Sequence, residues 1–284
     1  MEKNIKKIFP AIAITLVITL GLAGCGSSSG NSSPPPQNSG QIELVVFAAA
    51  SMTETLEEIS GLYAAAAPNV KLTFNFDSSG TLKTQIQEGA ESDLFISAGQ
   101  RQMDQLDIAA SDTVNTESLD FVATETRVNL LENRITLVVP NGNPKNINGF
   151  NDLANALENG EILMAMGNSD VPVGQYTQQI LKFYSLDEED LAAIGVISYG
   201  SNVKEVTTQV TEASVDCGVV YCTDAFSAGL DVMDYATTDM CGRVIYPAAV
   251  LKESTKKEAA QAFLDYLNTA EAMAVFEHVG FSKP

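Results

Sequence analysis

The sequence has one histidine, no tryptophan and only four cysteines in 284 residues. Most acid-base enzymes need a partner that titrates near neutral pH, and the single His278 lies near the end of the chain in a helical pattern. No Gly-Lys-Ser/Thr loop is present, and the stretch from Gly167 to Val171 lacks the last glycine of the G-x-S-x-G pattern. We therefore expect a protein that is not an enzyme and has no metal site or cofactor.

Positive charge is also scarce. The chain has 16 Lys and Arg against 36 Asp and Glu, which gives a formal net charge of -20. Nucleic acids and anionic lipids are therefore unfavourable partners. A small anion is still compatible with this charge, because bulk charge is screened within about 8 to 10 Å at physiological salt.

The amino terminus carries the one long apolar run. Three lysines stand among the first seven residues, an apolar stretch covers residues 8–22, and Leu22-Ala23-Gly24-Cys25 follows. This order predicts a lipoprotein signal peptide over residues 1–24, with lipid on Cys25. A transmembrane anchor is the alternative, but the run is shorter than the ~20 residues that a span needs. Residues 25–40 are predicted to be a flexible Ser- and Pro-rich linker with a reach of about 20 Å.

Three more cysteines follow, namely Cys217, Cys222 and Cys241. Export would permit one disulfide, but the sequence does not determine the pair. Cys217 and Cys222 bracket a short apolar strand pattern, so a direct bond between them is unfavourable. Buried thiols and one structural bridge both remain open.

Short apolar runs alternate with helix-period segments from residue 41 onward. Several runs are apolar throughout, which is typical of strands that are buried on both faces of a sheet. Alternating β and α elements over about 240 residues predict an α/β fold with two doubly wound sheets. The predicted strands are IELVVFAAA, KLTFNF, SDLFISA, RITLVVP, EILMAM, GVIS, CGVVY and VIYPAAV.

Four predicted strand-to-helix junctions have helix-capping chemistry. Helix starts of this kind present unpaired amides and the positive end of the helix dipole, at the strand ends where open α/β sheets bind ligands. Their convergence would form an anion site without Lys or Arg, although one capped helix is by itself ordinary. The junctions are Ser51 with Glu54 as a capping box, Ser78 or Ser79 before Thr81, Pro172 as a first helical residue, and Asn202 with Glu205.

Several strings, in order and spacing, resemble the periplasmic molybdate-binding protein family. The resemblance covers nearly all of residues 41–281. The strings are AAAS at 48–51, SSGTLKTQIQEGAESDLFISA at 78–98, NRITLVVPNGNP at 133–144, VPVGQY at 171–176, VVYCTDA at 219–225 and IYPAAV at 245–250.

The resemblance implies an oxyanion held by neutral donors alone. By motif position, the hydroxyl groups would come from Ser51, Ser79 and Tyr221, and further backbone amides from Val173 and Val203. Ser78 stays open as an alternative to Ser79. The residue after Tyr221, Cys222, departs from the family's pattern.

The resemblance also implies a two-lobed periplasmic-binding-protein fold of type II, with the ligand in the cleft between two mixed sheets. The expected lobes are residues 41–134 with 248–284, and residues 135–247. We expect a monomer, anchored by lipid to the outer face of the cytoplasmic membrane, that feeds an ABC permease and its ATPase subunits. Closure of the lobes on the ligand is expected.

Molybdate or tungstate is the expected ligand, and sulfate or phosphate is the alternative. Ferric iron is disfavoured because no adjacent tyrosine pair occurs. Hydrogenphosphate needs an acceptor for its proton, and Asp77, Asp170 and Asp224 lie near the predicted donors in sequence. Phosphate therefore stays open at this point.

Overall fold

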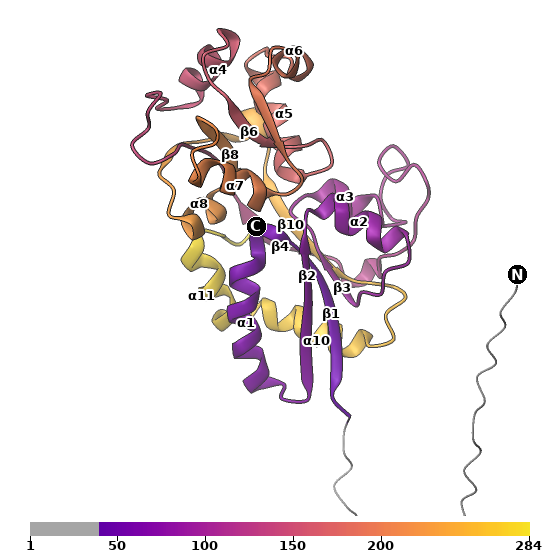
Figure 1. Cartoon of the computed structure of the whole chain (residues 1–284). Helices are drawn as coiled ribbons and strands as arrows, with labels where there is room; N and C mark the ends of the chain where they lie inside the picture. The colour runs from indigo at the N-terminus through magenta and orange to yellow at the C-terminus, as the bar shows by residue number, and fades with distance from the viewer. Residues whose placement is uncertain (1–39) are drawn as a thin grey trace, which may run out of the picture. The chain divides into compact units, whose positions relative to one another are not determined.

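The structure is a computed structural model that describes residues 40–284. The predicted signal peptide, Cys25 and almost all of the predicted linker lie outside the described residues. Two five-stranded mixed sheets, each flanked by helices, make up the described part (Figure 1). The predicted α/β fold with two mixed sheets is confirmed.

The first sheet has the strand order β2-β1-β3-β10-β4. Strand β1 pairs in parallel with β2 and β3, whereas β10 is antiparallel to β3 and β4. The bounds are Ile42–Ala49 for β1, Val70–Asp77 for β2, Leu94–Ile96 for β3, Val128–Asn133 for β4 and Val244–Val250 for β10.

The second sheet repeats this arrangement, in the order β7-β6-β8-β5-β9. Strand β6 pairs in parallel with β7 and β8, and β5 is antiparallel to β8 and β9. The bounds are Ile135–Val138 for β5, Met164–Gly167 for β6, Ile197–Gly200 for β7, Cys217–Tyr221 for β8 and Val232–Tyr235 for β9.

The helices divide between the two sheets. We call the first sheet with its helices the first lobe, and the second sheet with its helices the second lobe. Helices of the first lobe are α1 (Thr53–Ala66), α2 (Ser79–Gln87), α3 (Gln100–Asp104), α10 (Lys257–Leu267) and α11 (Ala270–Val279), with short 3-10 turns at Ala50–Met52 and Thr124–Thr126. Those of the second lobe are α4 (Phe150–Glu158), α5 (Pro172–Phe183), α6 (Glu188–Ala193), α7 (Val203–Thr211), α8 (Cys222–Ala228) and α9 (Thr238–Cys241).

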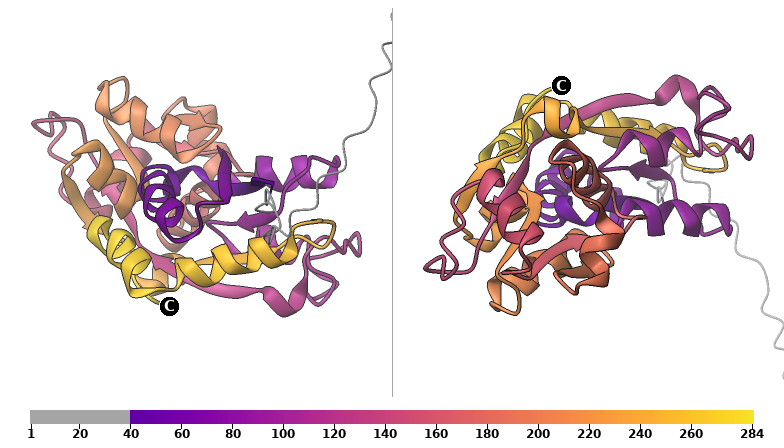
Figure 2. Two further views of the ribbon diagram at one scale, coloured as in Figure 1. Left: turned by 90° about the horizontal axis from the view of Figure 1, so that it is seen from below. Right: turned by 90° about the horizontal axis from the view of Figure 1, so that it is seen from above.

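The chain passes between the sheets twice. Arg134 is the one residue between β4 and β5, and the second passage precedes β10. Helices α10 and α11 then run along the outside of the first lobe, where α11 also contacts α8 (Figure 2). The residue boundaries of the lobes stay a prediction.

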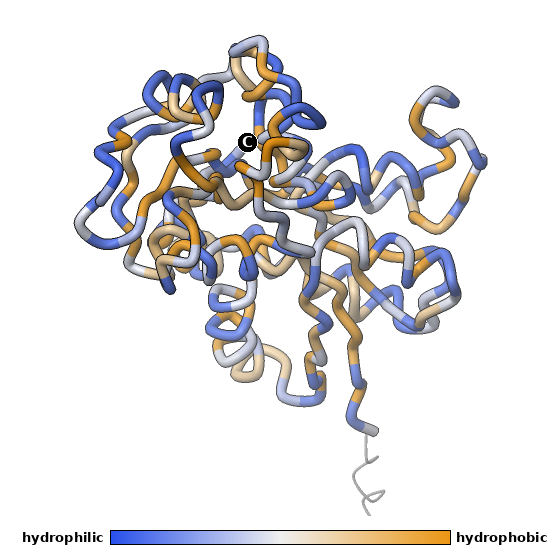
Figure 3. Tube along the Cα trace, turned by 45° about the horizontal axis from the view of Figure 1, so that its top comes forward, coloured by the Kyte–Doolittle hydropathy of each residue, from blue (hydrophilic) through white to orange (hydrophobic). Residues whose placement is uncertain are grey.

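The inner strands of both sheets are the most buried. In Figure 3, apolar stretches lie along the strands, and the outer loops are mostly hydrophilic. The predicted inward residues of the last two helices, Phe263, Leu267, Val275 and Phe276, are all buried. Cys217, Cys222 and Cys241 are buried free thiols, so the structure contains no disulfide among them. No helix within residues 40–284 is long and apolar enough to span a membrane.

Candidate functional site

A small cavity lies where the two lobes meet. Its volume is about 10 Å³, close to what a single water-sized particle occupies. The cavity is surrounded by the end of β1, the starts of α2, α5 and α7, and the end of β8. Its lining includes Ser51, Asp77, Ser79, Pro172, Val203 and Tyr221.

Ser51 lies in a 3-10 turn that separates β1 from α1. The predicted capping box of Ser51 with Glu54 is wrong, because the added turn makes Met52 the residue before the helix and no side chain caps it. The Ser51 hydroxyl instead lies 2.8 Å from the hydroxyl of Tyr246 on β10. Glu54 is free for a contact outside the cavity, described below.

The hydroxyl groups of Ser78 and Ser79 form different hydrogen bonds. Ser78 caps α2, because its Oγ accepts from the amide of Thr81 at 3.1 Å. Ser79 is the first residue of α2, and its Oγ accepts from the amide of Ala98 at 2.9 Å. The Ser79 hydroxyl has therefore used an acceptor position and keeps its own proton for a further partner. This arrangement favours Ser79 over Ser78 as a donor into the cavity.

Two helix starts face the cavity from the second lobe. Asn202 caps α7 by accepting from the amide of Glu205 at 3.1 Å, which leaves Val203 in the first turn. Pro172 opens α5, as predicted, and Val173 follows it. First-turn amides have no partner inside their own helix, and the helix dipole favours negative charge there. Val203 lines the cavity, and so do Val171 and Pro172, whereas the predicted donor Val173 is not among the lining residues.

Tyr221, at the end of β8, is almost fully buried. Among the described residues its hydroxyl oxygen forms no hydrogen bond of good geometry, although the Tyr246 hydroxyl is a neighbour, and an unpaired buried hydroxyl costs about 1 to 3 kcal/mol. Burial raises the pKa of this hydroxyl well above its ordinary value, so it keeps its proton at neutral pH. The Tyr221 hydroxyl therefore keeps a proton that it can donate to a ligand.

Charged groups are sparse at the cavity. No Lys or Arg is among the described residues that line it, and Asp77 is the one carboxylate there. The Oδ1 atom of Asp77 accepts from the amide of Ser78 at 2.7 Å and weakly from Asn202 at 3.4 Å. The lining thus offers mainly neutral donors, an arrangement suited to a small anion.

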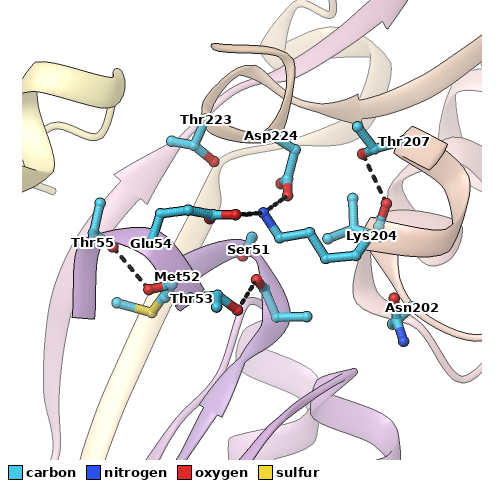
Figure 4. A network of polar contacts seen from close by, with 12 residues as sticks. Ser51, Met52, Thr53, Glu54, Thr55, Asn202, Lys204, Thr207, Thr223 and Asp224 are labelled. Carbon is cyan, nitrogen blue, oxygen red and sulfur yellow. Dashed lines mark hydrogen bonds and ion pairs between the residues drawn. The ribbon is translucent and has the colours of Figure 1, made fainter. Parts of the chain in front are cut away.

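A charged cluster outside the cavity joins the lobes (Figure 4). Lys204 on α7 contacts Glu54 on α1 and the buried Asp224 on α8, whose Oδ1 lies 3.2 Å from Nζ. Burial raises the pKa of Asp224 to about 6, while the Lys204 ammonium opposes that rise.

Several of these contacts are not predicted by the sequence, because their residues lie far apart along the chain. Tyr246 lies 195 positions from Ser51, and Lys204 lies 150 positions from Glu54. Tyr246 stands inside the IYPAAV string, but nothing local in that string identifies its partner.

Known proteins resemble this chain over most of its length. A candidate ABC transporter substrate-binding lipoprotein, YvgL of Bacillus subtilis, is 32% identical over 97% of this chain and 98% of its own. The molybdate-binding protein ModA of Mycobacterium tuberculosis is 30% identical over 95% of this chain and 96% of its own. The solved substrate-binding domain of a candidate molybdenum ABC transporter from Clostridium difficile is 29% identical, has a TM-score of 0.61, and covers 86% of this chain and 99% of its own.

The sequence profile of bacterial extracellular solute-binding proteins matches residues 44–282, which span both sheets and every residue of the cavity. Nearly the whole described chain is therefore accounted for by one family, and the chain belongs to the bacterial extracellular solute-binding proteins.

Proposed function

We propose that this protein is the substrate-binding component of an ABC importer, and that it delivers molybdate or tungstate to a membrane permease with its ATPase subunits. Family membership and the name of YvgL support the transport role, and the name of ModA supports molybdate as the ligand. The protein acts as a monomer with no cofactor of its own.

The unpaired Tyr221 hydroxyl is the observation that carries the choice of an oxyanion. Tyr221 lines a cavity that Ser51, Ser79 and Val203, the first residue of α7, also line. A ligand oxygen in the cavity would supply the acceptor that this hydroxyl lacks. Val173 would add a backbone amide from the start of α5.

Molybdate and tungstate fit a set of donors because they carry no proton near neutral pH. Sulfate is also unprotonated but smaller, and the names of the molybdate-binding relatives, rather than the size of the cavity, support its lower rank. Hydrogenphosphate brings a donor that needs an acceptor, and a mismatch costs roughly 1 to 3 kcal/mol. The expected order of affinity is molybdate about equal to tungstate, then sulfate, then phosphate.

Phosphate is the second candidate, because Asp77 lines the cavity and could accept the ligand proton. Calorimetric titration of the purified protein with all four anions at neutral pH tests the two candidates. Tight molybdate binding that Asp77→Asn leaves unchanged supports the donor-only site. Phosphate binding as tight as molybdate, and abolished by Asp77→Asn, would replace molybdate with phosphate.

We also propose that lipid on Cys25 holds the protein on the outer face of the cytoplasmic membrane. The lipobox-like sequence at residues 22–25 supports this location. Labelled fatty acid should be incorporated into the expressed wild-type protein and not into Cys25→Ser. Equal labelling of both proteins would contradict the anchor.

We further propose that the lobes, with boundaries near residues 134 and 248, close around the ligand. Only a closed arrangement lets donors from both lobes reach one small ion. Small-angle scattering should show compaction when the ligand is added, and an unchanged radius of gyration at saturation would contradict closure.

A further inference from the structure

The Ser51 hydroxyl is part of a buried chain of hydrogen bonds that begins away from the cavity. Its Oγ lies 2.8 Å from the Oη of Tyr246, and either oxygen could be the donor at that distance. The direction of this bond decides whether Ser51 can donate to a ligand. Asn133, at the end of β4, settles the direction.

The orientation of the Asn133 amide is fixed from both sides. Its Oδ1 accepts from the backbone amide of Arg134 at 2.8 Å and from the thiol of Cys222 at 3.1 Å. Its Nδ2 therefore points the other way, where it donates to Thr223 at 3.0 Å and to the Oη of Tyr246 at 3.2 Å. Cys222, which departs from the family's pattern, thus takes part in this series of hydrogen bonds through its contact with Asn133.

An amide nitrogen of this kind can only donate. The Tyr246 oxygen is therefore the acceptor from Asn133, and among the described residues Ser51 is the one hydrogen-bonded neighbour that can accept the single proton of Tyr246. Ser51 then accepts from Tyr246, and its own proton is left for the cavity. The chain of donors runs from Asn133 through Tyr246 to Ser51.

The Tyr246 ring is held rigidly where it lies. The residue is fully buried, and its ring meets the ring of Tyr221 edge-on at a centroid distance of 5.7 Å and the ring of Phe281 at 5.2 Å. Burial raises the pKa of Tyr246 well above its ordinary value, so its proton is retained at neutral pH. One side chain thus orients the Ser51 hydroxyl and packs against Tyr221.

We propose that Tyr246 is a positioning residue that makes Ser51 an obligatory donor, and that the site therefore selects oxyanions without a proton. Tyr246 does not itself line the cavity. The inference rests on the proposed function, because it assumes that Ser51 contacts the ligand. It adds a physical origin for the discrimination against hydrogenphosphate.

A double-mutant cycle tests the proposal. Affinities for molybdate, tungstate, sulfate and phosphate are measured by calorimetry for wild type, Tyr246→Phe, Ser51→Ala and the double variant. Tyr63→Phe is the matched control, since Tyr63 is also a buried tyrosine but packs against Phe263 away from the cavity. Thermal unfolding of each variant confirms that it is folded.

Tyr246→Phe should weaken binding of the tightest unprotonated anion by about three- to tenfold. It should weaken phosphate less, because the released Ser51 hydroxyl can turn to accept a proton. The double variant should bind no more weakly than Ser51→Ala, and Tyr63→Phe should bind like wild type.

Additive effects of the two substitutions, or an unchanged ratio of phosphate to sulfate affinity in Tyr246→Phe, would overturn the role of Tyr246 alone. Full affinity in Ser51→Ala would remove Ser51 from the proposed ligand donors and overturn this inference with it. Tighter binding of sulfate than molybdate by the wild type would change the proposed ligand, while the cycle, measured on sulfate, would still decide the role of Tyr246.

Discussion

The Lys204 ammonium lies 2.8 Å from both carboxylate oxygens of Glu54, and this contact joins α7 of the second lobe to α1 of the first (Figure 4). The same ammonium lies 3.2 Å from Oδ1 of Asp224, whose side chain is fully buried. Lys204 therefore forms ion pairs with one exposed and one buried carboxylate.

Substitution of Lys204 and substitution of Glu54 should lower stability by unequal amounts. Lys204→Met leaves the Asp224 carboxylate buried without its counter-charge and should lower the free energy of unfolding at pH 8 by about 2 to 3 kcal/mol. Glu54→Gln removes a half-exposed partner and should lower it by no more than about 1 kcal/mol. Urea unfolding of the ligand-free proteins measures both. Equal losses would mean that Asp224 does not depend on Lys204.

Stability should also depend on pH through Asp224. Its folded-state pKa is raised to about 6 from an ordinary value of 3.8, so the folded protein binds this proton more tightly than the unfolded chain does. The stabilising contribution is thus complete below pH 3.8 and lost as the pH rises through 6. Relative to Asp224→Asn, wild type should lose roughly 2 kcal/mol of unfolding free energy between pH 4 and pH 7. Parallel pH profiles of the two proteins would contradict the assignment.

Gly80 should be needed for closure. A Cβ atom at this position of α2 would lie 2.1 Å from the backbone oxygen of Asp170 in the second lobe, closer than atoms can approach. Gly80→Ala should therefore weaken the binding of every anion at least about tenfold, because the closed state becomes less populated. The ligand-induced compaction measured by scattering should shrink as well.

Gly61 provides the control for Gly80. It lies within α1, and a Cβ atom there would meet nothing within 4 Å. Gly61→Ala should stabilise the protein by up to about 1 kcal/mol and leave affinity unchanged. Similar affinities in the two alanine variants would show that the lobes need not approach at Gly80.

The three hydroxyls of the cavity should each contribute to affinity. Each would form a charge-assisted hydrogen bond with a desolvated dianion, so Ser51→Ala, Ser79→Ala and Tyr221→Phe should weaken molybdate binding about ten- to a hundredfold. Ser78→Ala removes a helix cap instead, and should lower stability by about 1 kcal/mol with little change in affinity. A larger loss of affinity in Ser78→Ala than in Ser79→Ala would exchange their roles.

The sequence predicts most of the fold because its signals are local. Eight strands begin from apolar runs, and the caps at Ser78 and Asn202 and the first-turn Pro172 lie where predicted. Strands β4 and β9 were not predicted. Both lie at the edges of their sheets, and their patterns, VNLLEN and VMDY, mix polar with apolar residues.

The site was predictable only in part. Strand ends and helix starts identify candidate donors, but the 3-10 turn at Ser51 replaced a cap that a four-residue motif suggested. The approach of Gly80 to Asp170, and of Tyr246 to Ser51, depends on how distant segments fold together. No short motif contains both members of either pair.

The absence of Lys and Arg among the described residues that line the cavity also determines how ionic strength acts on this protein. An anion that approaches a chain of net charge -20 is repelled at long range, and within residues 40–284 no cationic side chain lines the cavity to compensate for that repulsion. Added salt screens the repulsion, whereas the short hydrogen bonds inside a closed cavity are hardly screened. Capture should therefore become faster as salt is added, the opposite of the behaviour of binding sites that attract anions with lysines and arginines.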